Sequence, residues 1–243
     1  PPKALGQTVL NAFYYNALTI AEKIYTVLKK DEKIEFYHNK CIDFKKVFNE
    51  MFFDKDKQLY FDGTGGITGK MDCLPENTSK RYYTIYSNTL AVLYDLCEAD
   101  IGRKIIDEFL SSKEMCKTQP YFSHYVLEAT YKVGLFDEYG LPYLKQWSKL
   151  VDECDRGLKE CMYEFKGYNF DYSHGWCATP AYQLMNKISG LEILKPGFEE
   201  IRLKPNSLGL NRVDISIPSP KGDIKIVIGN TTQIEVPKQI KVL

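Results

Sequence analysis

Apolar residues recur every three or four positions through most of the chain before Gly190. This spacing is typical of helices that bury one face. It predicts a first helix over residues 9–28 and a second whose apolar positions run from Phe44 to Phe52, after the charged turn 29–33. The two helices would form a helical hairpin.

The same spacing resumes further along the chain and predicts two more helix pairs. Their apolar positions fall at 90–96 and 101–110, and then at 122–133 and 141–150. A last helix is expected over residues 178–189, closed by Gly190, because glycine adopts the left-handed conformation at a helix end without steric cost. The pattern therefore predicts about seven helices in successive hairpins, packed on one another without intervening strands.

Two stretches depart from the helical pattern. Residues 54–79 are rich in glycine and polar side chains, so we expect a long irregular loop there, which either lines a site or is a mobile surface excursion. After Gly190, prolines punctuate short β-branched runs in which apolar and polar residues alternate, as in Val213–Ile217 and Ile224–Ile228. Alternation of period two predicts antiparallel β structure, with a hairpin turn over 218–223. The predicted domains are a helical hairpin domain, 1–194, and a small antiparallel β-sheet or sandwich domain, 195–243.

Composition narrows the class of ligand. Lysine plus arginine equals aspartate plus glutamate at 32 each, so no basic excess favours nucleic acid. Tyrosine and phenylalanine number 18 and 13, and the aromatic share of 14% suits sugar sites, although core packing explains most single rings. No apolar run approaches the ~20 residues of a membrane span. We therefore expect a neutral or small ligand and no membrane partner.

The cysteines and histidines bear on compartment and cofactor. The seven cysteines are scattered without a C-x-x-C pair, which favours reduced thiols and a cytoplasmic location. The three histidines stand at positions 38, 124 and 174, far apart in sequence. No spacing of metal ligands is recognisable among them, so no metal and no cofactor are predicted.

The segment that carries the candidate chemistry runs from Gly157 to Tyr182. It contains Gly157-Leu-Lys-Glu160 and then Asp171-Tyr-Ser-His-Gly-Trp-Cys-Ala-Thr-Pro-Ala-Tyr182. A carboxylate, a histidine and an indole thus stand in a glycine-containing loop that leads into a helix. Such loops let side chains converge on a ligand.

The run Ser173–Tyr182 resembles a motif of the bacterial α-L-rhamnosidases: Ser-His-Gly/Ala-Trp, two residues, then Thr/Ser/Ala-Pro-x-Tyr. The stretch 191–205, with its Lys-Pro-Gly-Phe, resembles the link from barrel to β domain in that family. Residues 215–223 and the helix around Leu10–Tyr15 are similar too. The resemblance implies a six-hairpin, (α/α)6-barrel glycosidase, of which this chain would be the second half of the barrel and the C-terminal β domain.

The resemblance also implies a reaction. Inverting hydrolysis of a terminal α-L-rhamnoside needs a protonated acid at the leaving oxygen and a carboxylate that activates water about 6.5–9.5 Å away. Glu160 is the candidate general base. Glu164 is held in reserve, because many family members place the glutamate a few residues further after the glycine, next to a tryptophan, where this chain has Met162-Tyr163-Glu164. The family carries the general acid in an acidic motif further upstream, and no such motif is found here. The isolated chain is therefore expected to be inactive, as a piece of a longer protein or as a natural remnant without catalysis.

Five further residues are candidate substrate contacts. His174 would bind sugar hydroxyls, since a neutral imidazole both donates and accepts, while Tyr172 and Trp176 would provide apolar surface for a deoxysugar methyl. Tyr121 and Trp147 are candidates from their place in the barrel. For each of them, a capping or core role explains the sequence as well.

Three readings stay open at this point. The first is the rhamnosidase-like enzyme, whose partners would be a carbohydrate ligand and the upstream half of the same barrel, with a homo-oligomer as a further possibility. The second is a noncatalytic carbohydrate-binding or scaffold module, suggested by the missing acid. The third is a helical-barrel glycosidase for another sugar, since one fold supports many specificities.

Overall fold

A computed structural model describes residues 4–67, 81–112, 118–152, 157–162, 171 and 173–243. The chain forms two compact units: Pro1–Thr118 with Glu128–Leu135, and Gln119–Leu127 with Phe136–Leu243. The division passes through helix α5 (Pro120–Lys132). The change from helices to strands falls near the predicted boundary at residue 194, but that boundary itself stays a prediction.

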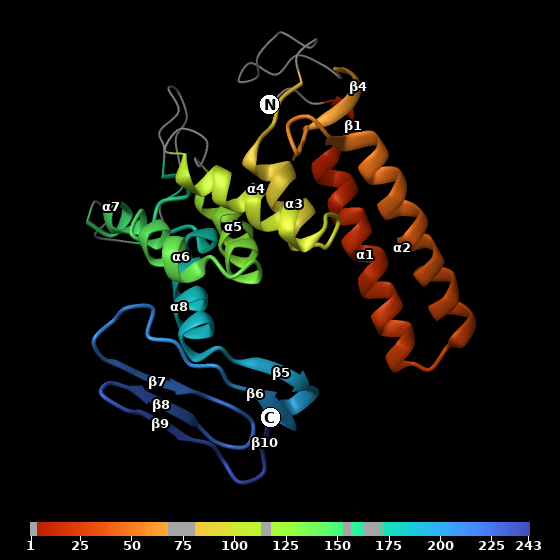
Figure 1. The fold of residues 1–243 in the computed structure, drawn as a ribbon. Coiled ribbons are helices and arrows are strands. Elements are labelled where there is room, and N and C mark those ends of the chain that lie inside the picture. The colour runs from red at the N-terminus through yellow and green to blue at the C-terminus, as the bar shows by residue number, and fades with distance from the viewer. Residues whose placement is uncertain (1–3, 68–80, 113–117, 153–156, 163–170, 172) are drawn as a thin grey trace. The chain divides into compact units, whose positions relative to one another are not determined.

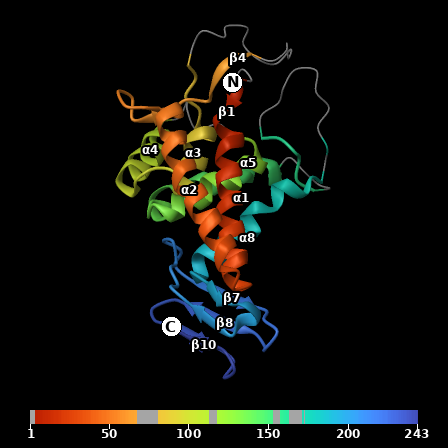
Figure 2. The same cartoon turned by 90° about the vertical axis from the view of Figure 1, so that its right-hand side faces the viewer.

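The first unit begins with a helical hairpin of α1 (Thr8–Val27) and α2 (Asp31–Phe52), which lie side by side in Figures 1 and 2. Ala12, Tyr15 and Leu18 are the buried apolar residues of α1. The apolar pattern that correctly predicts the helix also predicts its buried face, and this is wrong for residues such as Leu10, Ile24 and Val27, which are exposed. Helix α2 begins earlier than its apolar pattern, because the lysines and glutamates of its first half are good helix formers. The predicted hairpin is confirmed.

The rest of the first unit combines short strands with two more helices. Strand β1 (Ala4–Gln7) pairs antiparallel with β4 (Gly63–Ile67), and β2 (Phe53–Asp54) with β3 (Leu59–Tyr60). The expectation of an irregular loop over 54–79 is therefore wrong for the strand residues, whereas 68–80 lie outside the described residues. Helices α3 (Ile85–Leu93) and α4 (Ala99–Ser111) follow as predicted.

A buried asparagine joins strand β3 to helix α3. The Asn88 side chain accepts from the Tyr60 amide at 2.9 Å and donates to the Tyr60 carbonyl at 2.8 Å. It thereby pairs with both backbone groups of one strand residue, as a neighbouring strand would. Both residues are fully buried, so these bonds satisfy polar groups that would otherwise be costly to desolvate.

The second unit starts with part of α5, followed by α6 (Phe136–Leu144), α7 (Trp147–Asp152) and α8 (Thr179–Ser189). The helix expected over 141–150 is two helices. Gly190 ends α8 with φ +56°, and a Cβ there would lie 2.1 Å from the Lys204 carbonyl oxygen. The predicted glycine cap is confirmed, and this close backbone approach adds a second reason for glycine.

Two small sheets complete the second unit. Strands β7 (Val213–Ile217), β8 (Ile224–Ile228) and β9 (Thr232–Glu235) pair antiparallel in that order. Their alternation is seen directly, with Ile215 opposite Ile226 and both buried. The other sheet has the order β10 (Lys241–Val242), β6 (Glu200–Arg202), β5 (Glu192–Lys195), with β10 parallel to β6. The predicted fold class, mainly helical with a small β part, is confirmed.

None of the helices in the described part of the chain combines the length and the hydropathy that a membrane span needs.

Candidate functional site

Two short segments of the second unit, 157–162 and 171–177, are held together by their backbones. The Glu160 amide donates to the Asp171 carbonyl at 3.0 Å, and the His174 amide donates to the Leu158 carbonyl at 2.9 Å. The buried Cys177 thiol donates to the Lys159 carbonyl. These bonds place Glu160 and His174 on two adjacent backbone segments. Residues 163–170, which connect the segments, lie outside the described residues.

Gly157 permits the close approach of the two segments. Its φ is +140°, a conformation that residues with a side chain rarely adopt. A Cβ at this position would lie 2.2 Å from Ser173 Oγ and 3.0 Å from Ser173 Cα. Glycine is therefore required here by the packing of the candidate site itself.

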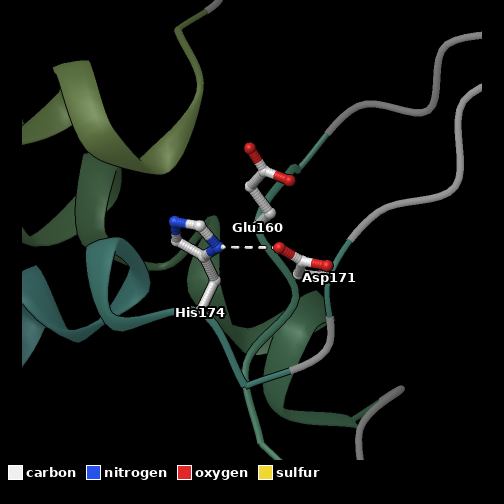
Figure 3. A group of neighbouring side chains, drawn as sticks. All are labelled: Glu160, Asp171 and His174. Atoms are coloured by element: carbon white, nitrogen blue, oxygen red, sulfur yellow. Dashed lines mark ion pairs between the residues drawn. The ribbon is translucent and has the colours of Figure 1, made fainter.

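Three titratable side chains converge where the segments meet (Figure 3). Ligand atoms of Glu160, Asp171 and His174 all lie within 4.8 Å of one another, and the His174 Nδ1 is 3.7 Å from an Asp171 carboxylate oxygen. Two carboxylates and an imidazole are donors that could hold a divalent transition metal. Sequence spacing does not reveal this group, because the fold brings its members together across residues that follow no ligand motif.

The electrostatic surroundings include a cysteine next to the candidate base. Burial, followed by the negative charge of Glu160, raises the pKa of the Cys161 thiol. A thiol whose pKa is raised stays protonated at neutral pH and is a poor nucleophile. Glu160 is thus the better candidate for chemistry of these two adjacent residues.

Aromatic rings extend the site on one side. The Trp176 ring contacts both His174 and Tyr121, with ring centroids 4.5 and 4.7 Å away. Trp176 is 51% exposed and Tyr121, in the first turn of α5, is 46% exposed. Large rings that stay exposed beside an imidazole offer a flat apolar face next to hydrogen-bonding atoms, which is what a sugar ring requires.

The remaining candidates lie elsewhere. Trp147 is buried, and its indole N–H donates to the Cys177 carbonyl at 2.9 Å, so it stabilises the turn that contains Trp176. Its direct contact with a ligand stays a prediction. Glu164 and Tyr172 lie outside the described residues.

The sequence does not predict two polar side chains of this region, Asp171 and His124. Asp171 begins the segment Asp171–Tyr182, but nothing in its spacing distinguishes it from other aspartates. His124 of α5 pairs with the Thr179 hydroxyl of α8, their Nδ1 and Oγ1 atoms 2.9 Å apart. The only available signal for Asp171 was its position three residues before a histidine in a glycine-containing loop.

Comparison with solved structures matches nearly the whole chain to α-L-rhamnosidases. A GH78 family rhamnosidase of Bacillus sp. GL1 superposes with a TM-score of 0.78 at 18% identity, over 97% of this chain and 26% of that one. The fold of this chain is similar to that of part of an α-L-rhamnosidase. The expected resemblance is thus confirmed for the fold.

Two further enzymes give the same result. The α-L-rhamnosidase of Aspergillus terreus matches with a TM-score of 0.73 at 14% identity, covering 95% of this chain and 27% of its own. That of Streptomyces avermitilis, in complex with L-rhamnose, matches with a TM-score of 0.71 at 14% identity, covering 96% of this chain and 22% of its own. The chain therefore spans about a quarter of the length of these enzymes. No family model and no curated protein sequence matches it.

Proposed function

We propose that this chain is part of an inverting glycoside hydrolase that acts on terminal α-L-rhamnosides, with Glu160 as the general base. The observation that carries the proposal is the convergence of Glu160, His174 and exposed Trp176 on a fold similar to α-L-rhamnosidases. One of those structures contains L-rhamnose. The substrate class is a neutral deoxysugar glycoside.

The residues have separate roles in this reaction. The Glu160 carboxylate would take a proton from the water that attacks the anomeric carbon, on the face opposite the leaving group. His174 would hydrogen-bond sugar hydroxyls, and Trp176 would pack against the apolar face of the sugar that carries the methyl group. The general acid would come from outside this chain.

An exposed apolar surface supports the proposal that α1 packs against another half of the barrel. Residues of α1 at spacings of three and four stay exposed, from Leu10 at 60% to Val27 at 81%. The whole set, here called the α1 stripe, is Leu10, Tyr14, Ala17, Ile20, Ile24 and Val27 of α1, with Leu28 directly after the helix. Continuous apolar stripes of this kind mark surfaces that another helix covers. The proposed occupant is the upstream half of the same barrel.

The reaction can be tested in the protein to which this segment belongs. Hydrolysis of an aryl α-L-rhamnoside, followed by NMR, should give β-L-rhamnose as the first product. Glu160→Gln should lower kcat more than about 100-fold with little change in KM, because the amide cannot act as a base. The matched control, Glu199→Gln, changes an exposed glutamate in the same unit and should leave turnover unchanged. Retention of configuration, or full activity of Glu160→Gln, would remove Glu160 from this role.

The hypothesis of a noncatalytic carbohydrate-binding module predicts a different result. The protein would then bind L-rhamnose in calorimetry but would release no rhamnose from any aryl rhamnoside. A panel of other aryl glycosides separates the third reading, since cleavage of a different sugar with the same dependence on Glu160 would keep the mechanism and change the specificity.

A further inference from the structure

We propose that Asp171 is a positioning residue for His174: its carboxylate holds the imidazole in the orientation and tautomer that present Nε2 to the ligand. The proposal rests on the proposed function only for the identity of that ligand, a sugar hydroxyl. The orientation of the ring is a property of the chain alone and can be measured without sugar.

The pair is built on fixed backbone. The Asp171 carboxylate oxygen lies 3.7 Å from His174 Nδ1, drawn as the dashed line in Figure 3. The Asp171 carbonyl accepts from the Glu160 amide, and the His174 amide donates to the Leu158 carbonyl. The His174 carbonyl in turn accepts from the Cys177 amide at 3.0 Å. Both main chains are therefore anchored, and only the side-chain torsions remain free.

The imidazole ring also contacts Trp176. Trp176 lies edge-on to the imidazole, with an interplanar angle of 67° and centroids 4.5 Å apart. The His174 side chain is 21% exposed, whereas that of Asp171 is 79% exposed. The imidazole is thus the enclosed member of the pair and the carboxylate is its outer neighbour. Glu160, the other carboxylate of the group, is the candidate base and is held on the facing segment.

The chemistry follows from what each nitrogen can do. A neutral imidazole carries one proton, and a carboxylate facing Nδ1 favours the form in which Nδ1 donates. Nε2 then carries no proton and can accept a hydrogen bond from a hydroxyl. Without the carboxylate, the proton moves to Nε2 in a larger share of molecules and the ring can rotate, so fewer molecules present the acceptor.

The first test reads the tautomer of His174 in the full chain. The chain has three histidines, so long-range proton–nitrogen NMR at a pH where all are neutral resolves each one. His38 is an internal reference, because its Nδ1 lies 3.0 Å from Glu22 in the other unit. We expect Asp171→Ala to shift His174 toward the Nε2-protonated form and leave His38 unchanged. Asp171→Asn, which keeps an acceptor oxygen, should restore the wild-type tautomer in part. An unchanged His174 tautomer in Asp171→Ala would overturn the proposal.

The second test reads ligand binding. Asp171→Ala should weaken L-rhamnose binding by about five- to tenfold, the size of one lost oriented hydrogen bond. In a His174→Ala background the same change should have no further effect, because Asp171 acts through the imidazole. An additional loss in that background would make Asp171 a direct contact and overturn the positioning role. If the tautomer shifts but no variant, nor the wild type, binds rhamnose, the positioning role stands and the proposed substrate fails.

Discussion

Two regions of the molecule expose apolar side chains, but the groups that neighbour these side chains differ. The α1 stripe of the first unit is dominated by aliphatic residues at regular helical spacing, such as Ile24 and Val27. The surface of the second unit around Trp176 is aromatic, irregular in backbone, and adjoins a histidine and two carboxylates. The α1 stripe suits packing against another helix. The surface around Trp176 suits binding of a polar ligand that has one apolar face. Exposure alone does not separate scaffold from site, whereas the neighbouring groups do.

The largest expected effect tests whether the two faces of α1 differ as described. Leu18 lies on the buried face of α1. Leu18→Ala should lower the free energy of unfolding by about 2–4 kcal/mol, because the substitution leaves a cavity. Val27→Ala, on the stripe, should change it by less than about 0.5 kcal/mol. Urea unfolding of the full chain, compared among wild type and the two variants, measures both. Equal costs would mean that the stripe is already covered in the isolated chain.

The next prediction separates the backbone strain of a substituted glycine from a steric effect on the candidate site in the second unit. Gly157→Ala should lower L-rhamnose affinity at least about tenfold, because its Cβ would push Ser173 and the segment carrying His174 away. Gly209 also has a positive φ, +82°, but has open space around it. Gly209→Ala should thus cost φ strain of about 1–2 kcal/mol without loss of binding. Calorimetry with L-rhamnose compares the two, and equal binding losses would show that strain alone is responsible.

A smaller effect concerns the pH response of the first unit. Burial raises the pKa of Asp62, whose one carboxylate oxygen accepts from Thr84 and Ser87 hydroxyls. The folded chain therefore holds this proton more tightly than the unfolded chain does. The associated stability is present below the ordinary pKa of 3.8 and is lost as the pH rises through the folded value. Asp62→Asn, which stays neutral, should flatten this fall in a series of melting temperatures.

Asp54, in the same unit, provides the control of opposite sign. A hydrogen bond from the Tyr83 hydroxyl lowers the pKa of Asp54, so its contribution is present above 3.8 and lost as the pH falls. Asp54→Asn should remove stability at neutral pH and spare it in acid. A wild-type pH slope that survives in Asp62→Asn would assign the response to another group.

Much of the fold could be predicted because its helices and one sheet are regular. The spacing of α1 and the alternation of β7 and β8 repeat over enough residues to identify them. The pairs β1–β4 and β2–β3 could not be found, since strands of two to five residues with several glycines carry no alternation. The role of Asn88 as a substitute for a neighbouring strand depends on tertiary contact alone.

The candidate site was predictable in its members and unpredictable in its arrangement. The motif resemblance selected Glu160, His174 and Trp176 in advance. It could not select Asp171, whose nearness to His174 depends on the backbone bonds between segments 157–162 and 171–177. Nor could it show that Trp147 is buried while Trp176 is exposed, because both are tryptophans near the same motif.

This difference between the two tryptophans allows the most direct measurement. Titration of the chain with L-rhamnose should change its tryptophan fluorescence saturably, since Trp176 is exposed at the proposed sugar face and the only other tryptophan, Trp147, is buried. The change should vanish in Trp176→Phe and weaken in His174→Ala. No saturable change with L-rhamnose, or the same change in Trp176→Phe, would contradict a rhamnose site at this surface.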